Sequence, residues 1–179
     1  MSSKVVEEFK RVIKKGKKYN TYKFALAKFL LDFSKNSKYI EDTKIDYNLI
    51  AKYFFNYYWI EICEKGRKQV SENKNIPVIE TIIKDYCGIK NINIDEIIRE
   101  IAQKCFRDVI PRFQYKNGTL YEHYHQPQSR GYKMPPDDKR YILLYKNTIK
   151  ELKNNYEVLF DEVNMELKNY FNSINSTKL

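Results

Sequence analysis

Residues 20–34 read NTYKFALAKFLLDFS, and this segment determines the fold class. At helical spacing it is apolar on nearly every side, and a helix of that kind usually lies at the centre of its domain. Asn20 or Thr21 is a suitable N-cap, and the pattern continues to about Lys35. We therefore predict a central buried helix. Its broad apolar face is formed by Tyr22, Ala25, Leu26, Phe29, Leu30 and Phe33.

The sequence around this segment predicts further helices. Apolar residues recur with helical periodicity at 3–15, 46–66 and 78–86, and again from Asp95 onward. A long closing helix is expected from about Asp137 to Asn172, with a break or kink at Asn154-Asn155. Six of the seven residues from Tyr53 to Trp59 are aromatic, which at this spacing is typical of a core and not of a base-stacking surface.

One segment predicts β-structure. Asn117-Gly118 lies between alternating residues, which favours a β-hairpin inserted after residue 110. The expected fold is therefore mainly α, a compact bundle of six or seven helices with one inserted β-hairpin. We expect a single domain over 1–179, divisible into lobes at 1–108 and 109–179.

Charge is unevenly distributed along the chain. The net charge is +10, and residues 1–40 hold eleven Lys or Arg against three acidic residues. Such asymmetry suggests an anionic partner. A generally lysine-rich composition explains many of the lysines well, but it explains the scarcity of acidic residues in this part of the chain less well. Lys65, Arg67 and Lys68 form a second, smaller basic group in a polar linker.

The three cysteines, Cys63, Cys87 and Cys105, show no C-x-x-C pair and are odd in number. We expect each to be a small buried thiol in a reducing compartment. No stretch approaches the roughly 20 apolar residues of a membrane span, and no signal peptide opens the chain. The sequence therefore predicts a cytoplasmic protein without membrane contact.

Catalytic motifs are weak. His123 and His125 in YEHYHQ would share one face of a strand, a spacing that suits metal ligation, but no third ligand is apparent. There is no phosphate-binding glycine-rich loop, and no nucleophile has a recognisable partner. We therefore expect no catalytic residue, no resident metal and no cofactor, and we interpret both histidines as exposed polar residues.

Basic residues are the better candidates for function. They would neutralise phosphates, while Asn20 and Thr21 at a helix N-terminus would hold one phosphate directly. A second contact is expected around the hairpin. The predicted nucleic-acid-binding residues are Lys10, Arg11, Lys14, Lys15, Lys17, Lys18, Asn20, Thr21, Lys23, Arg112, Lys116, Arg130 and Lys133.

The order of several segments resembles the N-terminal helical region of bacterial HNH endonuclease-type proteins of restriction and antiviral defence systems. The resemblance covers about residues 10–175. Its most specific pieces are 20–26, Tyr57-Tyr58-Trp59, Pro77-Val78-Ile79 and Ile110-Pro111-Arg112-Phe113. In such proteins a small ββα nuclease domain follows, and here it would begin after Leu179. The resemblance therefore implies the recognition module without the catalytic domain.

Three functions follow as hypotheses. The first is a non-catalytic module that binds double-stranded DNA for a restriction- or defence-type nuclease. The second is a protein–protein interaction module, such as a phage-encoded inhibitor or an adaptor subunit, with a protein partner or a homodimer. The third is a metal-dependent nuclease that uses His123 and His125. Scattered or carboxylate-paired cations in the first forty residues would favour the second hypothesis over the first.

Overall fold

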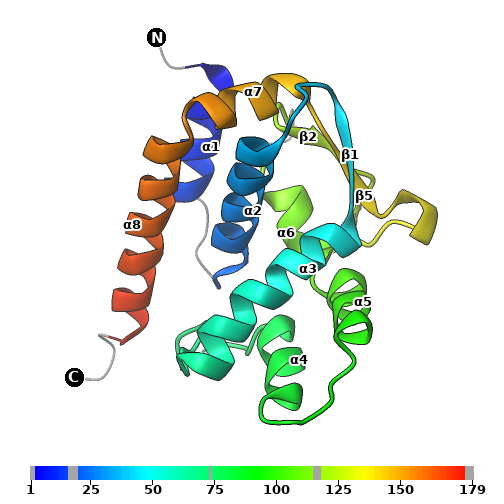
Figure 1. Cartoon of the computed structure of the whole chain (residues 1–179), viewed down its shortest axis with the longest axis vertical. Helices are drawn as coiled ribbons and strands as arrows, with labels where there is room; N and C mark the ends of the chain where they lie inside the picture. Colours follow the sequence, from blue (N-terminus) through cyan, green and yellow to red (C-terminus); the bar gives the residue numbers. More distant parts are fainter. Residues whose placement is uncertain (1–2, 16–19, 73, 115–117, 176–179) are drawn as a thin grey trace.

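The computed structural model describes residues 3–15, 20–72, 74–114 and 118–175. These residues form a mainly helical fold with a small antiparallel sheet (Figure 1), which confirms the predicted fold class. Their buried apolar side chains belong to one contiguous cluster. The α-helices are α1 (Lys4–Lys15), α2 (Tyr22–Asn36), α3 (Tyr47–Tyr58), α4 (Val78–Tyr86), α5 (Ile94–Lys104), α6 (Phe106–Arg112), α7 (Lys146–Asn154) and α8 (Tyr156–Asn175).

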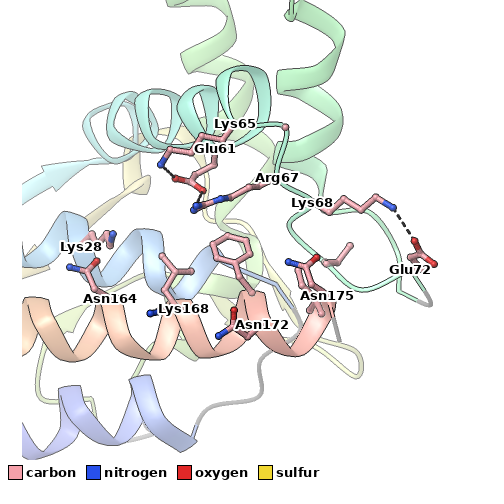
Figure 2. Close-up of a pocket in the computed structure, with 15 residues that line it drawn as sticks. Lys28, Glu61, Lys65, Arg67, Lys68, Glu72, Asn164, Lys168, Asn172 and Asn175 are labelled. Carbon is pink, nitrogen blue, oxygen red and sulfur yellow. Dashed lines mark hydrogen bonds and ion pairs between the residues drawn. The ribbon is translucent and has the colours of Figure 1, made fainter. Parts of the chain in front are cut away.

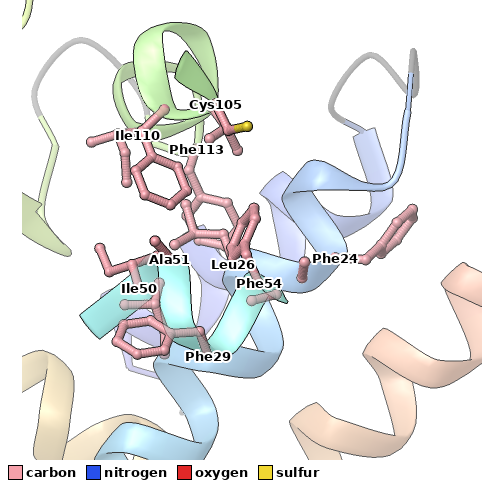
Figure 3. Packing of buried hydrophobic residues seen from close by; sticks show 14 of the residues in the cluster. Phe24, Leu26, Phe29, Ile50, Ala51, Phe54, Cys105, Ile110 and Phe113 are labelled. Carbon is pink, nitrogen blue, oxygen red and sulfur yellow. The ribbon is translucent and has the colours of Figure 1, made fainter. Parts of the chain in front are cut away.

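Helix α2 is the centre of the bundle, as the sequence predicted. It contacts α1, α3, α6, α7 and α8. Phe24, Leu26 and Leu30 are fully buried on it. Figure 3 shows the side chains of α2 beside those of α3 and α6.

Helix α3 carries most of the aromatic segment and continues into a π-helical turn, η1 (Trp59–Glu64). The Asp46 carboxylate caps α3 by accepting a hydrogen bond from the Asn48 amide at 2.7 Å. Phe54 and Tyr58 are fully buried, which confirms that these aromatic residues belong to the core. The turn ends before Gly66, whose φ of 62° reverses the chain direction.

The three-stranded antiparallel sheet has the order β1-β5-β2, where β1 is Thr43–Asp46, β5 is Tyr141–Leu144 and β2 is Tyr121–Glu122. Thr43 and Tyr121 both lie opposite Leu144 in the register. The prediction of helix from Asp137 was wrong at β5, where Ile142 and Leu144 are buried and their neighbours less so. A four-residue apolar run does not distinguish a helix from a strand by periodicity. The short 3₁₀ turn η2 (Asp137–Lys139) precedes β5.

The predicted hairpin across Asn117-Gly118 was wrong in its pairing. β2 pairs with β5, and the expected partner strand is absent before residue 115, where α6 extends to Arg112. Phe113 is buried against Phe9 of α1 and does not lie on a strand. A hairpin does occur further on, where β3 (Gln126–Pro127) pairs with β4 (Tyr132–Lys133).

The C-terminal helices confirm the predicted break at Asn154-Asn155, which separates α7 from α8. Helix α8 lies along one side of the molecule, next to α1 and α2 (Figure 1). Among the described residues, no helix is both long and apolar enough to cross a membrane.

The cysteines differ from the prediction. Cys63 on η1 and Cys87 after α4 form a disulfide, with Cα atoms 5.6 Å apart. Cys105 alone is a free buried thiol, and burial raises its pKa to about 12. A spacing of 24 residues carries no information on pairing, which depends on the packing of α4 against η1.

Candidate functional site

The basic residues of α1 are partly neutralised within the protein. Lys14 forms an ion pair of 2.5 Å with Glu162 of α8, and Lys10 lies 3.5 Å from the second oxygen of the same carboxylate. The hydrogen bond from Lys14 to Glu162 raises the pKa of the Lys14 ammonium. Glu162 is only 12% exposed, so these lysines attach α1 to α8.

Thr21 is not available to a phosphate, contrary to the prediction. It is fully buried, and its hydroxyl lies 2.9 Å from the Tyr58 hydroxyl and donates to Gln69 Oε1 at 2.7 Å. The Asn20 side chain accepts from the Tyr22 amide at 3.0 Å. The side chains of Asn20 and Thr21 at the start of α2 therefore bind the protein's own groups.

Lys23 also serves the fold. Its ammonium donates to the Val12 and Ile13 carbonyl oxygens, at 3.1 and 3.0 Å, near the end of α1. A cation at a helix C-terminus interacts favourably with the carbonyl dipoles there. Arg11 and Lys15 are exposed on α1. Lys17, Lys18 and Lys116, which the sequence also predicted as contacts, lie outside the described residues.

The basic residues predicted around the hairpin do come together, on α6 and on the hairpin of β3 and β4, apart from Lys116, which lies outside the described residues. Helix α6 packs against β4, and the Arg112 guanidinium lies 5.9 Å from the ring centroid of Tyr132. Lys133 and Arg130 are exposed on the same hairpin. Arg112 is partly compensated by Asp108 at 3.6 Å, so this surface is less cationic than the sequence suggested.

The histidine pair is not exposed as expected. His125 is 6% exposed, its Nδ1 lies 3.3 Å from the Tyr47 hydroxyl, and the two histidine rings are 5.4 Å apart. The His125 amide donates to His123 Nδ1. Within the described ranges, no group of three or more His, Cys, Asp or Glu side chains has a metal-binding arrangement.

A groove on another face collects cations that lie far apart in the sequence. It runs between α8 and the segment that follows η1, with a volume of about 720 Å³ (Figure 2). Five of its lining residues are cations and two are carboxylates, and three asparagines of α8 add amide donors. The cations are Lys28, Lys65, Arg67, Lys68 and Lys168, the carboxylates Glu61 and Glu72, and the asparagines Asn164, Asn172 and Asn175.

Glu61 organises the wall of the groove that η1 provides. Its carboxylate is buried and accepts from Lys65 at 2.7 Å and from Arg67 at 3.1 Å. The Arg67 amide also donates to the Glu61 carbonyl oxygen at 2.8 Å. One buried carboxylate thus fixes two cations, both of which remain about half exposed to the groove.

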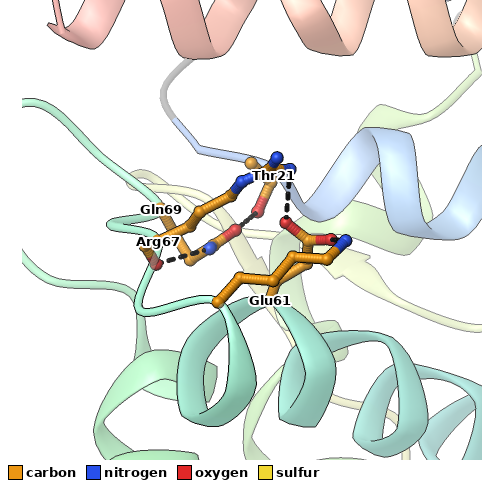
Figure 4. A network of polar contacts seen from close by, with 5 residues as sticks. Thr21, Glu61, Arg67 and Gln69 are labelled. Carbon is orange, nitrogen blue, oxygen red and sulfur yellow. Dashed lines mark hydrogen bonds and ion pairs between the residues drawn. The ribbon is translucent and has the colours of Figure 1, made fainter.

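A hydrogen-bond network behind this wall connects it to the core. Gln69 accepts from Thr21 and donates to the Arg67 carbonyl oxygen at 2.9 Å (Figure 4). The backbone N–H of Gln69 donates to the carboxylate of Glu80 on α4 at 3.1 Å, and the Tyr170 hydroxyl donates to the backbone carbonyl oxygen of Gln69 at 2.9 Å. The loop is therefore held by α2, α4 and α8 together, which makes the position of Arg67 well defined.

The opposite wall of the groove, on α8, carries both apolar and cationic side chains. Phe171 of α8 lies under the Arg67 guanidinium, 5.3 Å from its ring centroid, and Leu167 and Ile174 continue the apolar strip. Lys168 is exposed on the same helix and, among the described residues, has no ion pair. A groove with cations, amides and an aromatic ring is suited to an anion that also has an apolar part.

Sequence reasoning identified part of this site. It noted Lys65, Arg67 and Lys68 as a small basic group but did not connect them with Lys28 or α8. Helical spacing places four residues of α8 on one face: Asn164, Lys168, Phe171 and Asn172. This spacing is the sequence signal that could have assigned them to one site. Which segment faces them depends on tertiary packing. No family model, curated protein or solved structure matches the chain.

Proposed function

We propose that the protein binds nucleic acid non-catalytically, with the phosphate backbone in the groove between α8 and the segment after η1. The observation that supports this proposal is the gathering of five cations and three asparagines from three distant segments. Phosphate oxygens are commonly bound by this set of side chains. The position differs from the α1 surface that the sequence favoured.

Part of the binding energy would come from counterion release. Lys65, Arg67, Lys68 and Lys168 are exposed enough to meet phosphates, and Phe171 offers a partly buried ring to a base or sugar. Affinity should therefore fall steeply with salt concentration. A module for double-stranded DNA in a restriction- or defence-type nuclease is the form of this proposal that the sequence resemblance suggests.

The test is fluorescence anisotropy with a labelled 20-residue single strand and the matching duplex, at about 50 and 200 mM salt. We expect binding at low salt and a loss of affinity of tenfold or more, on the order of that known for several phosphate contacts, at the higher salt. The two oligonucleotides separate a duplex ligand from a single-stranded one.

Charge reversal locates the surface. The Lys68→Glu/Lys168→Glu variant changes two groove cations, and the Lys90→Glu/Arg99→Glu variant makes the same charge change at exposed positions outside the groove. We expect only the first to abolish binding. Equal losses in both variants would mean that total charge, and not the groove, governs binding, and no binding by wild type at low salt would refute the proposal.

A second candidate function is a protein–protein contact. The paired lysines of α1 favour it, and so does a second groove of about 530 Å³ that is lined mostly by apolar atoms of Phe29, Phe33, Leu49 and Tyr53. Leu49 is 47% exposed there. Size-exclusion chromatography of wild type and a Leu49→Glu variant tests for a homodimer: loss of a dimer peak in the variant would support it, and a monomeric wild type would count against it.

A further inference from the structure

Lys28 differs from three other groove cations, Lys65, Arg67 and Lys68, because no carboxylate of the described residues forms an ion pair with it. Lys65 and Arg67 share Glu61, and Lys68 pairs with Glu72 at 3.1 Å. The Lys28 ammonium instead lies over two rings, 5.6 Å from the centroid of Tyr57 and 5.4 Å from that of Phe160. It is partly buried yet has no ion pair among the described residues. A partly desolvated cation without a direct ion pair is costly to the fold.

Tyr57, one of these two aromatic neighbours, has an unsatisfied polar atom. Its hydroxyl oxygen is buried and has no hydrogen-bond partner in the described part of the chain. Burial raises the pKa of Tyr57, and the charges of Glu61 and Arg67, which both line the groove, shift this pKa further in opposite directions. The hydroxyl is thus protonated, and the Tyr57 ring lies beside Lys28, which lines the groove. A buried unsatisfied donor next to an unpaired cation suggests a missing anionic ligand.

The third donor at this end is Asn164 of α8. Figure 2 shows Lys28 and Asn164 together at one end of the groove, away from Lys68 and Glu72 at the other. The Lys28 ammonium and the Asn164 amide both line this end of the groove, and the unsatisfied Tyr57 hydroxyl belongs to a ring that Lys28 contacts. A phosphate group offers several acceptor oxygens and a negative charge, which matches this set better than a neutral ligand does.

We infer that Lys28 and the Tyr57 hydroxyl form a phosphate subsite at one end of the groove, which anchors one phosphate group of the nucleic acid ligand. This inference rests on the proposed function for the identity of the ligand. Lys28 should contribute more to affinity than the exposed Lys168, because an anion gains most from a cation that has already lost part of its hydration.

The pKa of Lys28 supports this inference with a separate observable. Burial lowers this pKa, while Glu61 and Asp32 partly oppose the shift. A bound phosphate would raise it again, so binding at an alkaline pH close to the lowered pKa should take up a proton. Calorimetric titrations in two buffers of different ionisation enthalpy measure that uptake, and the Lys28→Met variant should lack it.

The affinity test uses Lys28→Met, with Lys168→Met as the matched control, and the oligonucleotide that wild type binds more tightly. We expect Lys28→Met to lower affinity by about tenfold or more and Lys168→Met by about twofold. Tyr57→Phe, which keeps the ring, should lower affinity by roughly threefold or more, as expected for a lost hydrogen bond. The melting temperature of Lys28→Met should not fall, because methionine packs well against Tyr57 and Phe160.

A second probe separates this inference from the proposed function. Inorganic phosphate should raise the melting temperature of wild type and of Lys168→Met, but not that of Lys28→Met. If wild type binds no oligonucleotide yet responds to phosphate through Lys28, the nucleic-acid proposal fails and the subsite stands. If wild type binds an oligonucleotide and Lys28→Met matches Lys168→Met, or if phosphate has no effect in any variant, the subsite is refuted.

Discussion

His125 is the residue whose ionisation opposes the fold most clearly. Burial and the neighbouring His123 lower the pKa of His125 to about 4, from 6.5 for an ordinary histidine. Asp108 and a backbone hydrogen bond to Phe106 oppose this shift but do not cancel it. The folded protein therefore holds the neutral imidazole, stacked beside Tyr47.

The consequence is a loss of stability in mild acid. Because the folded-state pKa lies below the unfolded one, the stabilisation is complete above about pH 6.5 and is lost as the pH falls toward 4. We expect the free energy of unfolding to fall by up to about 3 kcal/mol over that range. Urea denaturation at several pH values measures it.

The variants His125→Gln and His123→Gln identify the residue responsible. The first should flatten the pH dependence between pH 6.5 and 4. The second should keep most of the pH dependence. Burial also lowers the pKa of the half-buried His123, but to a lesser extent, so His123 itself contributes less to the loss of stability in acid. An unchanged pH dependence in His125→Gln would show that other groups, such as paired carboxylates, cause the acid sensitivity.

At the level of elements, the disulfide between Cys63 and Cys87 connects η1 to the end of α4. It closes a loop that contains the groove cations of residues 65–68 and the whole of α4. Cross-linking of this kind stabilises a protein mainly by restricting its unfolded chain. The core residues Ile79 and Ile83 of α4 are fully buried and anchor this helix by packing, so the fold should persist without the bond.

Reduction should therefore lower the free energy of unfolding by roughly 3 kcal/mol without unfolding the protein at 25 °C. Chemical denaturation with and without reductant gives this value. The Cys63→Ala/Cys87→Ala variant should match the reduced wild type and should not respond to reductant. Three reactive thiols in the untreated, denatured wild type would show instead that the disulfide does not form.

At the level of the whole molecule, the cations fall into two groups. Some hold helices together, and others line the groove that is proposed to bind nucleic acid. Lys10 and Lys14 join α1 to α8 through Glu162, whereas the groove lies on the side of α8 that faces η1 (Figure 2). Helix α8 thus uses one face to bind α1 and another to line the groove. A largely buried carboxylate pairs with cations on both faces, Glu162 on one and Glu61 on the other, but the groove also holds Lys28 and Lys168, which form no ion pair among the described residues.

This division predicts that α1 variants affect stability more than binding. Lys10→Gln/Lys14→Gln leaves Glu162 largely buried without its partners, so the melting temperature should fall. The matched variant Lys4→Gln/Lys15→Gln removes two exposed cations of the same helix and should change it little. Loss of nucleic-acid binding by Lys10→Gln/Lys14→Gln at an unchanged melting temperature would contradict this view and favour α1 as the binding surface.

The sequence alone determined the helical fold class, the central position of residues 22–36, the cap at Asp46 and the break at Asn154-Asn155. These features depend on local periodicity and on hydrogen bonds between residues close in the chain, so a single sequence contains the information. It also indicated a surplus of positive charge.

Tertiary structure decided the features that join distant segments. The pairing of Tyr141–Leu144 with two separate strands, the Cys63–Cys87 disulfide, the burial of Thr21 and His125 and the pairing of Lys14 with Glu162 all involve partners at least 20 residues apart. The groove likewise combines Lys28 with residues of η1, the following loop and α8. Local pattern specifies which faces are apolar or charged, but the close packing of the core specifies which faces meet.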